Sequence, residues 1–164
     1  MPDWLTHVLV MYVLLQVVAW YEPRLTPPYI AAGMVGGLLP DIAKLQLILP
    51  RSRVEALLGV PFSWQGVSWV WGIVLVVLAL SFLVDVKHRK AVIGLLLSGS
   101  IVHLLLDGII HSPGRRPTTL LRPTTYLQLP ELYLSSNVWP AVIAVVVSFV
   151  VFTLTQWQQC DTET

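Results

Sequence analysis

The stretch Ser100–Arg116 reads SIVHLLLDGIIHSPGRR, an apolar run that ends in a charged turn. His103, Asp107 and His111 recur at steps of four residues, which places them on one face of a helix. Ionisable groups inside a membrane segment are costly unless they are paired or bind an ion, so they mark a functional site. The alternative is a polar stripe that faces water at a bundle end. It applies best to His111, which precedes the Pro113-Gly114 turn.

The composition around this stretch is that of an integral membrane protein. Of the 164 residues, 55% are hydrophobic and 12% are charged, whereas soluble domains carry about 25% charged residues. We expect a single transmembrane domain over residues 1–164, located in the cell membrane with the lipid bilayer as its partner. The net charge of +1 gives no reason to expect a nucleic-acid partner.

Apolar segments predict an all-α transmembrane helical bundle with about five crossings. They are Leu5–Trp20, Tyr29–Leu39, Val67–Val84, Ala91–Ile110 and Trp139–Trp157. A Pro40-Asp41 break ends the second segment, because proline interrupts a continuous helix. Asp41 then either caps a short helix over Ile42–Leu49 or serves as a ligand. Gly33 and Gly37 form a small-xxx-small pair that lets another helix approach closely.

The connections between the segments carry two further signals. Ser52-Arg-Val-Glu55 has the form of a capping box and Gly59 suits a helix C-terminus, so a short surface helix is predicted over Arg53–Leu58. The sequence DVKHRK over Asp85–Lys90 predicts a short charged loop. We expect His88 to be solvated or to face lipid headgroups in this loop and assign it no chemistry.

Five crossings would bring the isolated polar groups to one side of the membrane, which we name face A. His7 lies near the start of the first segment and Asp41 near the end of the second, so both lie near face A. Asp107 and His111 lie near the end of the fourth segment, also at face A, with His103 about two turns deeper than His111. The same face would hold Arg51, Arg53, Arg115, Arg116 and Arg122. The connection between the third and fourth segments would lie at the opposite face B, and the distribution of basic residues leaves the orientation of the two faces open.

Histidine and aspartate together are ligands that suit zinc or a similar divalent ion. A bound metal lowers the pKa of its water toward about 7 and so supplies a nucleophile. Arg115 and Arg116 are candidates for binding a phosphate through paired N–H donors; the alternative is that they meet lipid headgroups or water. The set of residues therefore predicts metal-assisted hydrolysis, with a phosphoester as the candidate substrate.

Three motifs in order carry a family resemblance. Asp3-Trp-Leu-Thr-His7, Gly37-Leu-Leu-Pro-Asp41 and His103-Leu-Leu-Leu-Asp107 resemble those of the small membrane-bound metal-dependent hydrolases. The ligand order is also similar to that of zinc-dependent phospholipase C, an all-helical enzyme that cleaves phosphodiesters. The resemblance implies that Asp41, His103 and Asp107 bind one metal ion. It also implies that His7, with Asp107 as a bridge, helps to bind a second ion.

One position departs from the family pattern. Members of this family commonly carry a histidine in the stretch that enters the third segment, which here reads FSWQGVSW over Phe62–Trp69. Ser68 occupies the place of that histidine, and serine is a poor zinc ligand. A water could fill the gap, the site could bind metal weakly, or activity could be lost. His111 does not match a family ligand by spacing, but it would be a substitute ligand if the helix end bends.

We therefore expect an integral membrane, metal-dependent hydrolase that acts on a phosphoester or lipid-like substrate through metal-activated water. Asp41 would orient this water or act as the general base. The rival class is a non-catalytic membrane protein with a structural or degenerate metal site. A transporter or channel is a third class. It fits less well, because the site of a transporter should lie near the membrane midplane, whereas these groups gather toward one face.

Overall fold

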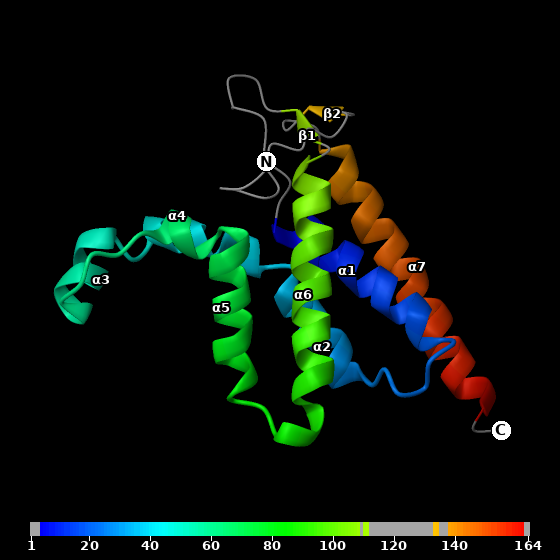
Figure 1. Ribbon diagram of the computed structural model, residues 1–164. Coiled ribbons are helices and arrows are strands. Elements are labelled where there is room, and N and C mark those ends of the chain that lie inside the picture. Colours follow the sequence, from blue (N-terminus) through cyan, green and yellow to red (C-terminus); the bar gives the residue numbers. More distant parts are fainter. Residues whose placement is uncertain (1–3, 109, 112–132, 135–137, 163–164) are drawn as a thin grey trace.

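The computed structural model describes residues 4–108, 110–111, 133–134 and 138–162, and Figure 1 shows their arrangement. The helices are α1 (Trp4–Ala19), α2 (Pro27–Gly36), the 3-10 helix η1 (Leu39–Leu47), α3 (Arg51–Leu58), α4 (Trp64–Val67), α5 (Val70–Ser81), α6 (Val86–Gly108) and α7 (Trp139–Thr162). The two-residue strands β1 (Ile110–His111) and β2 (Tyr133–Leu134) pair in parallel. The predicted all-helical fold class is confirmed.

The helices differ in whether their length suffices to cross a bilayer, which takes about 20 apolar residues. Within the described residues, α6 and the first 20 residues of α7 are long and apolar enough. The pair α2 and η1 adds a third crossing if the two helices form one span bent by 58°. The helices α1 and α5 are apolar but have only 16 and 12 residues. These lengths are consistent with a membrane protein of two or three crossings, and five crossings stay a prediction.

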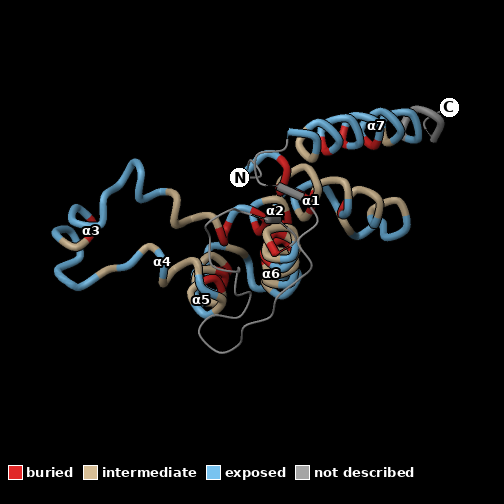
Figure 2. The backbone as a smooth tube through the Cα atoms, turned by 90° about the horizontal axis from the view of Figure 1, so that it is seen from above, coloured by how far each residue is buried: buried red, intermediate tan, exposed pale blue. Residues whose placement is uncertain are grey.

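Helix α6 lies at the centre of the bundle, with α2 against it along its length and α5 and α1 as its other neighbours (Figures 1 and 2). Glycines allow the close approach of α2 and α6. A Cβ atom on Gly99 would collide with the backbone of Gly33, and one on Gly36 would collide with the backbone of Leu96. Gly33 also makes room for Leu15 of α1. The predicted close approach at Gly33 and Gly37 is confirmed, since the backbones of both residues would meet a Cβ atom on Gly99, and Gly36 adds a third close contact that we did not predict.

Two apolar clusters hold the bundle together. One, between η1, α5 and α6, contains Leu39, Ile73, Val77 and Leu96; the other, between α1 and α2, contains Met11, Leu15 and Ile30. Helix α7 packs on α1, where Trp20 Nε1 donates a hydrogen bond to Thr155 Oγ1 at 3.1 Å. The outer side of α7 exposes large apolar side chains, among them Ile143, Val146 and Phe149. Such a surface suits contact with lipid.

Helices α3 and α4 extend to one side of the bundle (Figure 2). Helix α3 ends as predicted at Gly59, which has the left-handed φ of 68°. The predicted capping box is wrong, because the helix begins at Arg51 and has no side-chain cap. Glu55 instead accepts hydrogen bonds from Phe62 N at 2.9 Å and Arg51 Nε at 2.8 Å. The Phe62 N–H, followed by Arg51, holds the pKa of Glu55 below its usual range.

The predicted charged loop over residues 85–90 is also wrong, since α6 begins at Val86. The Asp85 carbonyl accepts hydrogen bonds from the backbone N–H groups of His88 and Arg89, which starts the helix. His88 is half-buried, and its Nδ1 lies 2.5 Å from Tyr29 Oη of α2. His88 is therefore only partly exposed and contacts Tyr29, because α2 packs beside this end of α6.

The two remaining helix predictions around the break need correction. The third apolar segment does not run unbroken from Val67, because the chain leaves helical geometry at Trp69 before α5 begins. The short helix after the break is the 3-10 helix η1, and it begins at Leu39 rather than Ile42. Asp41 therefore lies in its first turn, with Leu38 as the N-cap residue. Asp41 does not cap a following helix.

Candidate metal centre

Two histidines from distant parts of the chain are stacked inside the bundle. The rings of His7 in α1 and His103 in α6 lie 3.8 Å apart between centroids, with 21° between their planes. Each residue is only 1% exposed. Helical spacing explains their positions. His7 lies on the same buried face of α1 as Met11 and Leu15, and His103 lies on the same buried face of α6 as Leu96.

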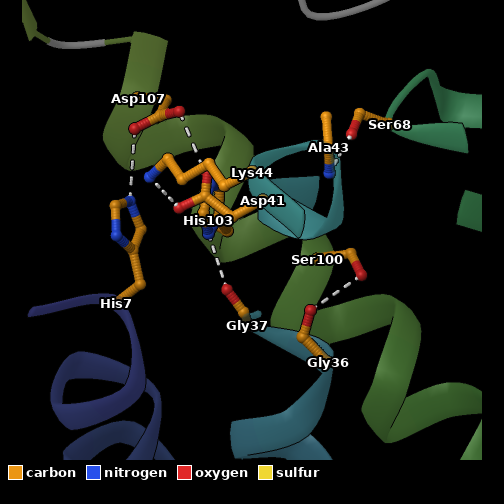
Figure 3. Close-up of polar contacts among 10 residues, drawn as sticks. All are labelled: His7, Gly36, Gly37, Asp41, Ala43, Lys44, Ser68, Ser100, His103 and Asp107. Carbon is orange, nitrogen blue, oxygen red and sulfur yellow. Dashed lines mark hydrogen bonds and ion pairs between the residues drawn. The ribbon is translucent and has the colours of Figure 1, made fainter. Parts of the chain in front are cut away.

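The Asp107 carboxylate lies against both rings (Figure 3). Its Oδ1 is 3.3 Å from His7 Nε2, and its Oδ2 is 3.5 Å from His103 Nε2. Asp107 follows His103 by one helical turn, so α6 places two potential ligands side by side while α1 supplies the third. One ligand atom from each residue lies within 4.8 Å of the others. This spacing allows His7, His103 and Asp107 to hold one metal ion.

A backbone hydrogen bond sets the orientation of His103. Its Nδ1 lies 2.6 Å from the carbonyl oxygen of Gly37, between α2 and η1. A carbonyl only accepts, so Nδ1 carries a proton, and in the neutral imidazole the lone pair is then on Nε2, the nitrogen nearest Asp107 and Asp41. Histidines that bind metals commonly donate their second N–H to a carbonyl in this way. The hydrogen bond therefore prepares Nε2 of His103 as a ligand.

The break between α2 and η1 explains why the Gly37 carbonyl is free to accept. Pro40 has no N–H, so the Gly36 carbonyl loses its helical donor, and the Ser100 hydroxyl lies 2.9 Å from it instead. The Asp41 N–H donates to Leu38 O at 3.1 Å rather than to Gly37 O. Two consecutive carbonyls thus become available to side chains of α6. The Pro-Asp break shapes the site through its backbone as well as through the Asp41 carboxylate.

Asp41 lies at the margin of this group, and Lys44 accompanies it. Asp41 Oδ1 is 3.9 Å from His103 Nε2, and Asp41 Oδ2 forms an ion pair with Lys44 Nζ. Lys44 Nζ also lies 5.7 Å from the centroid of a Trp4 ring. Sequence reasoning missed Lys44 as a site residue. The signal that could have found it is its spacing of three residues after Asp41, which places both on one face.

The residues present fit a divalent metal ion. His7 is fully buried, yet neither ring nitrogen has a hydrogen-bond partner within the described part of the chain, although Nε2 approaches Asp107. A buried polar group without a hydrogen bond costs about 1–3 kcal/mol. A metal ion would accept a lone pair of His7 and remove this penalty. Two imidazoles and a carboxylate also form a donor set that suits zinc.

Ser68 does not take part in this group. Its Oγ accepts a hydrogen bond from Ala43 N at 3.2 Å and so supports η1, on the side away from His7 (Figure 3). The His111 side chain, Arg115 and Arg116 lie outside the described residues. Of the four predicted metal ligands, the structure brings His7, His103 and Asp107 together and places Asp41 beside them.

Comparisons with known proteins do not identify a family for this chain. No protein-family model, no curated protein and no solved structure matches this chain. The likeness to the membrane-bound hydrolases therefore depends on the three sequence motifs, and the case for a metal centre depends on the geometry around His103.

Proposed function

We propose that this chain is an integral membrane, metal-dependent hydrolase of the cell membrane that acts on a phosphoester or lipid-like substrate at the bilayer surface. The observation that carries the proposal is the buried group of His7, His103 and Asp107. Burying two imidazoles beside a half-buried carboxylate in an apolar bundle is unfavourable unless they serve an ion or a reaction. The resemblance to membrane-bound hydrolases adds the reaction class.

In this proposal His7, His103 and Asp107 hold a divalent ion, with zinc as the best match to the donors. When bound, such an ion acidifies a water ligand and polarises a phosphoryl oxygen. Asp41 Oδ1, at 3.9 Å from His103 Nε2, is the candidate to orient the attacking water and accept its proton. Lys44 balances the charge of Asp41 while the site is at rest.

We also propose that all five apolar segments cross the bilayer and that the metal centre lies near face A. The shorter helices α1 and α5 have exposed tryptophans near the ends that this topology places at face A, namely Trp4, Trp69 and Trp71. Tryptophan favours the membrane interface. The short helices would then cross with their flanking residues in the interfacial regions.

A non-catalytic protein with a structural or degenerate metal site is the second candidate. Two observations favour it. The Ser68 hydroxyl accepts a hydrogen bond from Ala43 N and does not join the ligand group, and Lys44 already forms an ion pair with Asp41. The Lys44 ammonium group can neutralise the Asp41 carboxylate in place of a metal ion. This candidate predicts metal binding or stable packing without turnover.

Metal analysis combined with an activity assay tests the proposal. The protein purified in detergent is analysed for bound metals by plasma mass spectrometry, and hydrolysis of bis(p-nitrophenyl) phosphate is measured before and after chelation. We expect near-stoichiometric metal, chelator-sensitive turnover, and at least a tenfold loss of metal in His103→Ala and Asp107→Ala. His88→Ala is the matched control, because His88 lies on the same helix but contacts Tyr29.

Two outcomes would reject parts of this proposal. Absence of metal in the intact protein, with no change in His103→Ala and Asp107→Ala, would remove the metal centre. Metal that is bound without turnover, even in Ser68→His, would favour the structural candidate.

A further inference from the structure

An open cavity lies directly beside the candidate metal centre. It has a volume of about 200 Å³ and is formed by the start of α1, the end of α2 and η1. Its apolar walls come from Trp4, Val35, Leu38, Leu39, Ile42 and Leu45. The side chains of Val35, Leu38 and Leu45 are partly exposed, so the cavity opens to the surroundings of the bundle.

The described lining of this cavity contains one charged residue. Asp41 is the charged residue in its lining, and the same carboxylate approaches His103 Nε2 and pairs with Lys44. Lys44 Nζ also lies 5.7 Å from the ring of Trp4, which is a wall of the cavity. A molecule that places an apolar tail in the cavity therefore has its other end at the ammonium group and the candidate metal ligands.

We infer that the cavity between Trp4, Leu38 and Leu45 holds one hydrocarbon chain of an amphiphilic substrate whose anionic phosphate lies at Lys44. This inference rests on the proposed function and names its substrate class. A single alkyl chain suits the small, apolar volume better than a peptide, whose backbone groups would find almost no hydrogen-bond partners in this lining. The cationic end selects an anionic head group.

The ion pair between Lys44 and Asp41 fits this arrangement. When Asp41 serves as a ligand or as the base, the Lys44 ammonium loses its partner. A substrate phosphate is the anion that would replace it. Lys44 then acts as a substrate-binding residue, and the chain in the cavity determines which phosphoesters reach the centre.

Photoaffinity labelling in lipid nanodiscs tests the inference without requiring hydrolysis. The probes are dodecylphosphonate, which cannot be hydrolysed, and dodecanol, each with a diazirine at the end of the chain. Cross-linked residues are identified by peptide mass spectrometry. We expect labelling by the phosphonate on Trp4, Leu38 and Ile42 at least fivefold above that on exposed Phe149 of α7.

Matched variants separate the cavity from general lipid contact. Leu45→Trp and Ile42→Phe fill the cavity and should lower its labelling at least fivefold. Leu47→Trp is the control, because Leu47 lies in the same helix η1 but is 83% exposed and does not line the cavity. Lys44→Gln should lower labelling by the phosphonate and leave labelling by the alcohol unchanged.

Each contrary result has a defined meaning. Equal labelling of the cavity and of α7, or unchanged labelling in both filling variants, would overturn the binding site for the hydrocarbon chain. Equal effects of Lys44→Gln on the two probes would overturn the role of Lys44. Labelling of the cavity in a protein that never hydrolyses phosphodiesters would support the lipid site and reject the hydrolase. Turnover without labelling would overturn the lipid site and leave the hydrolase in place.

Discussion

His103 Nδ1 donates a hydrogen bond to the Gly37 carbonyl at 2.6 Å, across the contact between α6 and the break that follows α2. This bond joins a candidate ligand to the backbone that Pro40 interrupts. It sets which ring nitrogen of His103 is protonated, so a helix break in one segment determines the chemistry of a side chain in another.

The role of the break can be tested by Pro40→Ala. An alanine N–H at this position would favour a continuous helix, in which Asp41 N competes with His103 for the Gly37 carbonyl. We expect zinc affinity to fall about tenfold, as for other losses of a hydrogen bond that orients a ligand. The measurement is a competition titration with a chromogenic chelator. Pro61→Ala, in the connection before α4, is the control, and equal affinities in the two variants would contradict the role of the break.

His7 should matter more to zinc binding than to the stability of the metal-free protein. His7→Phe removes a buried ring without hydrogen bonds, but it also removes the contact of Nε2 with Asp107 at 3.3 Å, so we expect the free energy of unfolding of the metal-free protein to change by less than about 1 kcal/mol. The same change should abolish the rise in thermal midpoint that zinc produces by binding the folded state. Thermal unfolding in detergent, with and without zinc, measures both effects.

Thr6→Val provides the control for His7. The Thr6 hydroxyl is also buried without a partner in the described structure. Its replacement should stabilise the metal-free protein but leave the response to zinc intact. A His7→Phe protein that still gains stability from zinc would place the ion elsewhere.

The approach of α2 to α6 predicts opposite tolerance at two glycines of α6. A methyl group at Gly99 would meet the backbone of Gly33, whereas in the described part of the chain no atom outside the helix's own nearby backbone lies within 4 Å of a methyl group at Gly94. Gly99→Ala should therefore lower stability by about 1–3 kcal/mol and weaken zinc binding, because α6 must move away from the break. Gly94→Ala should do neither. The thermal midpoints and the metal content of the two variants test this prediction. A Gly99→Ala protein with unchanged midpoint and metal content would contradict the close packing of α2 and α6.

Ser68 should matter for stability rather than for metal binding. Ser68→Ala leaves the Ala43 N–H without the hydroxyl that accepts from it, so we expect a loss of about 1 kcal/mol with metal content unchanged. Ser68→Thr retains the hydroxyl and should restore stability. Loss of the metal in Ser68→Ala would show instead that Ser68 belongs to the ligand group.

The five-crossing topology predicts where two exposed side chains lie. Leu57 of α3 would be at face A, and Leu83, in the turn between α5 and α6, at face B; both are exposed. In a Cys160→Ser background, Leu57→Cys and Leu83→Cys should react with a membrane-impermeant maleimide from opposite sides of sealed vesicles. Reaction of both from one side would mean that α5 does not cross the membrane.

The sequence by itself determined those features that depend on composition or on neighbours along the chain. Apolar runs and scarce charge predicted an all-helical membrane protein, and Gly59 predicted the end of α3 because only its own φ is needed there. The spacing of His103 and Asp107 was sufficient to place them on one face of α6, since the helical repeat is local. These predictions needed no knowledge of how the helices pack.

Only the tertiary structure decided how the site is assembled. The stacking of His7 on His103, the hydrogen bond from His103 to Gly37 and the contact of His88 with Tyr29 all join segments far apart in the chain. Their distances are set by the packing of α1, α2 and α6, and in particular by how closely Gly36 and Gly99 let the backbones approach. A sequence pattern assigns residues to faces of a helix, but the spatial relation between two faces is a property of the packed bundle.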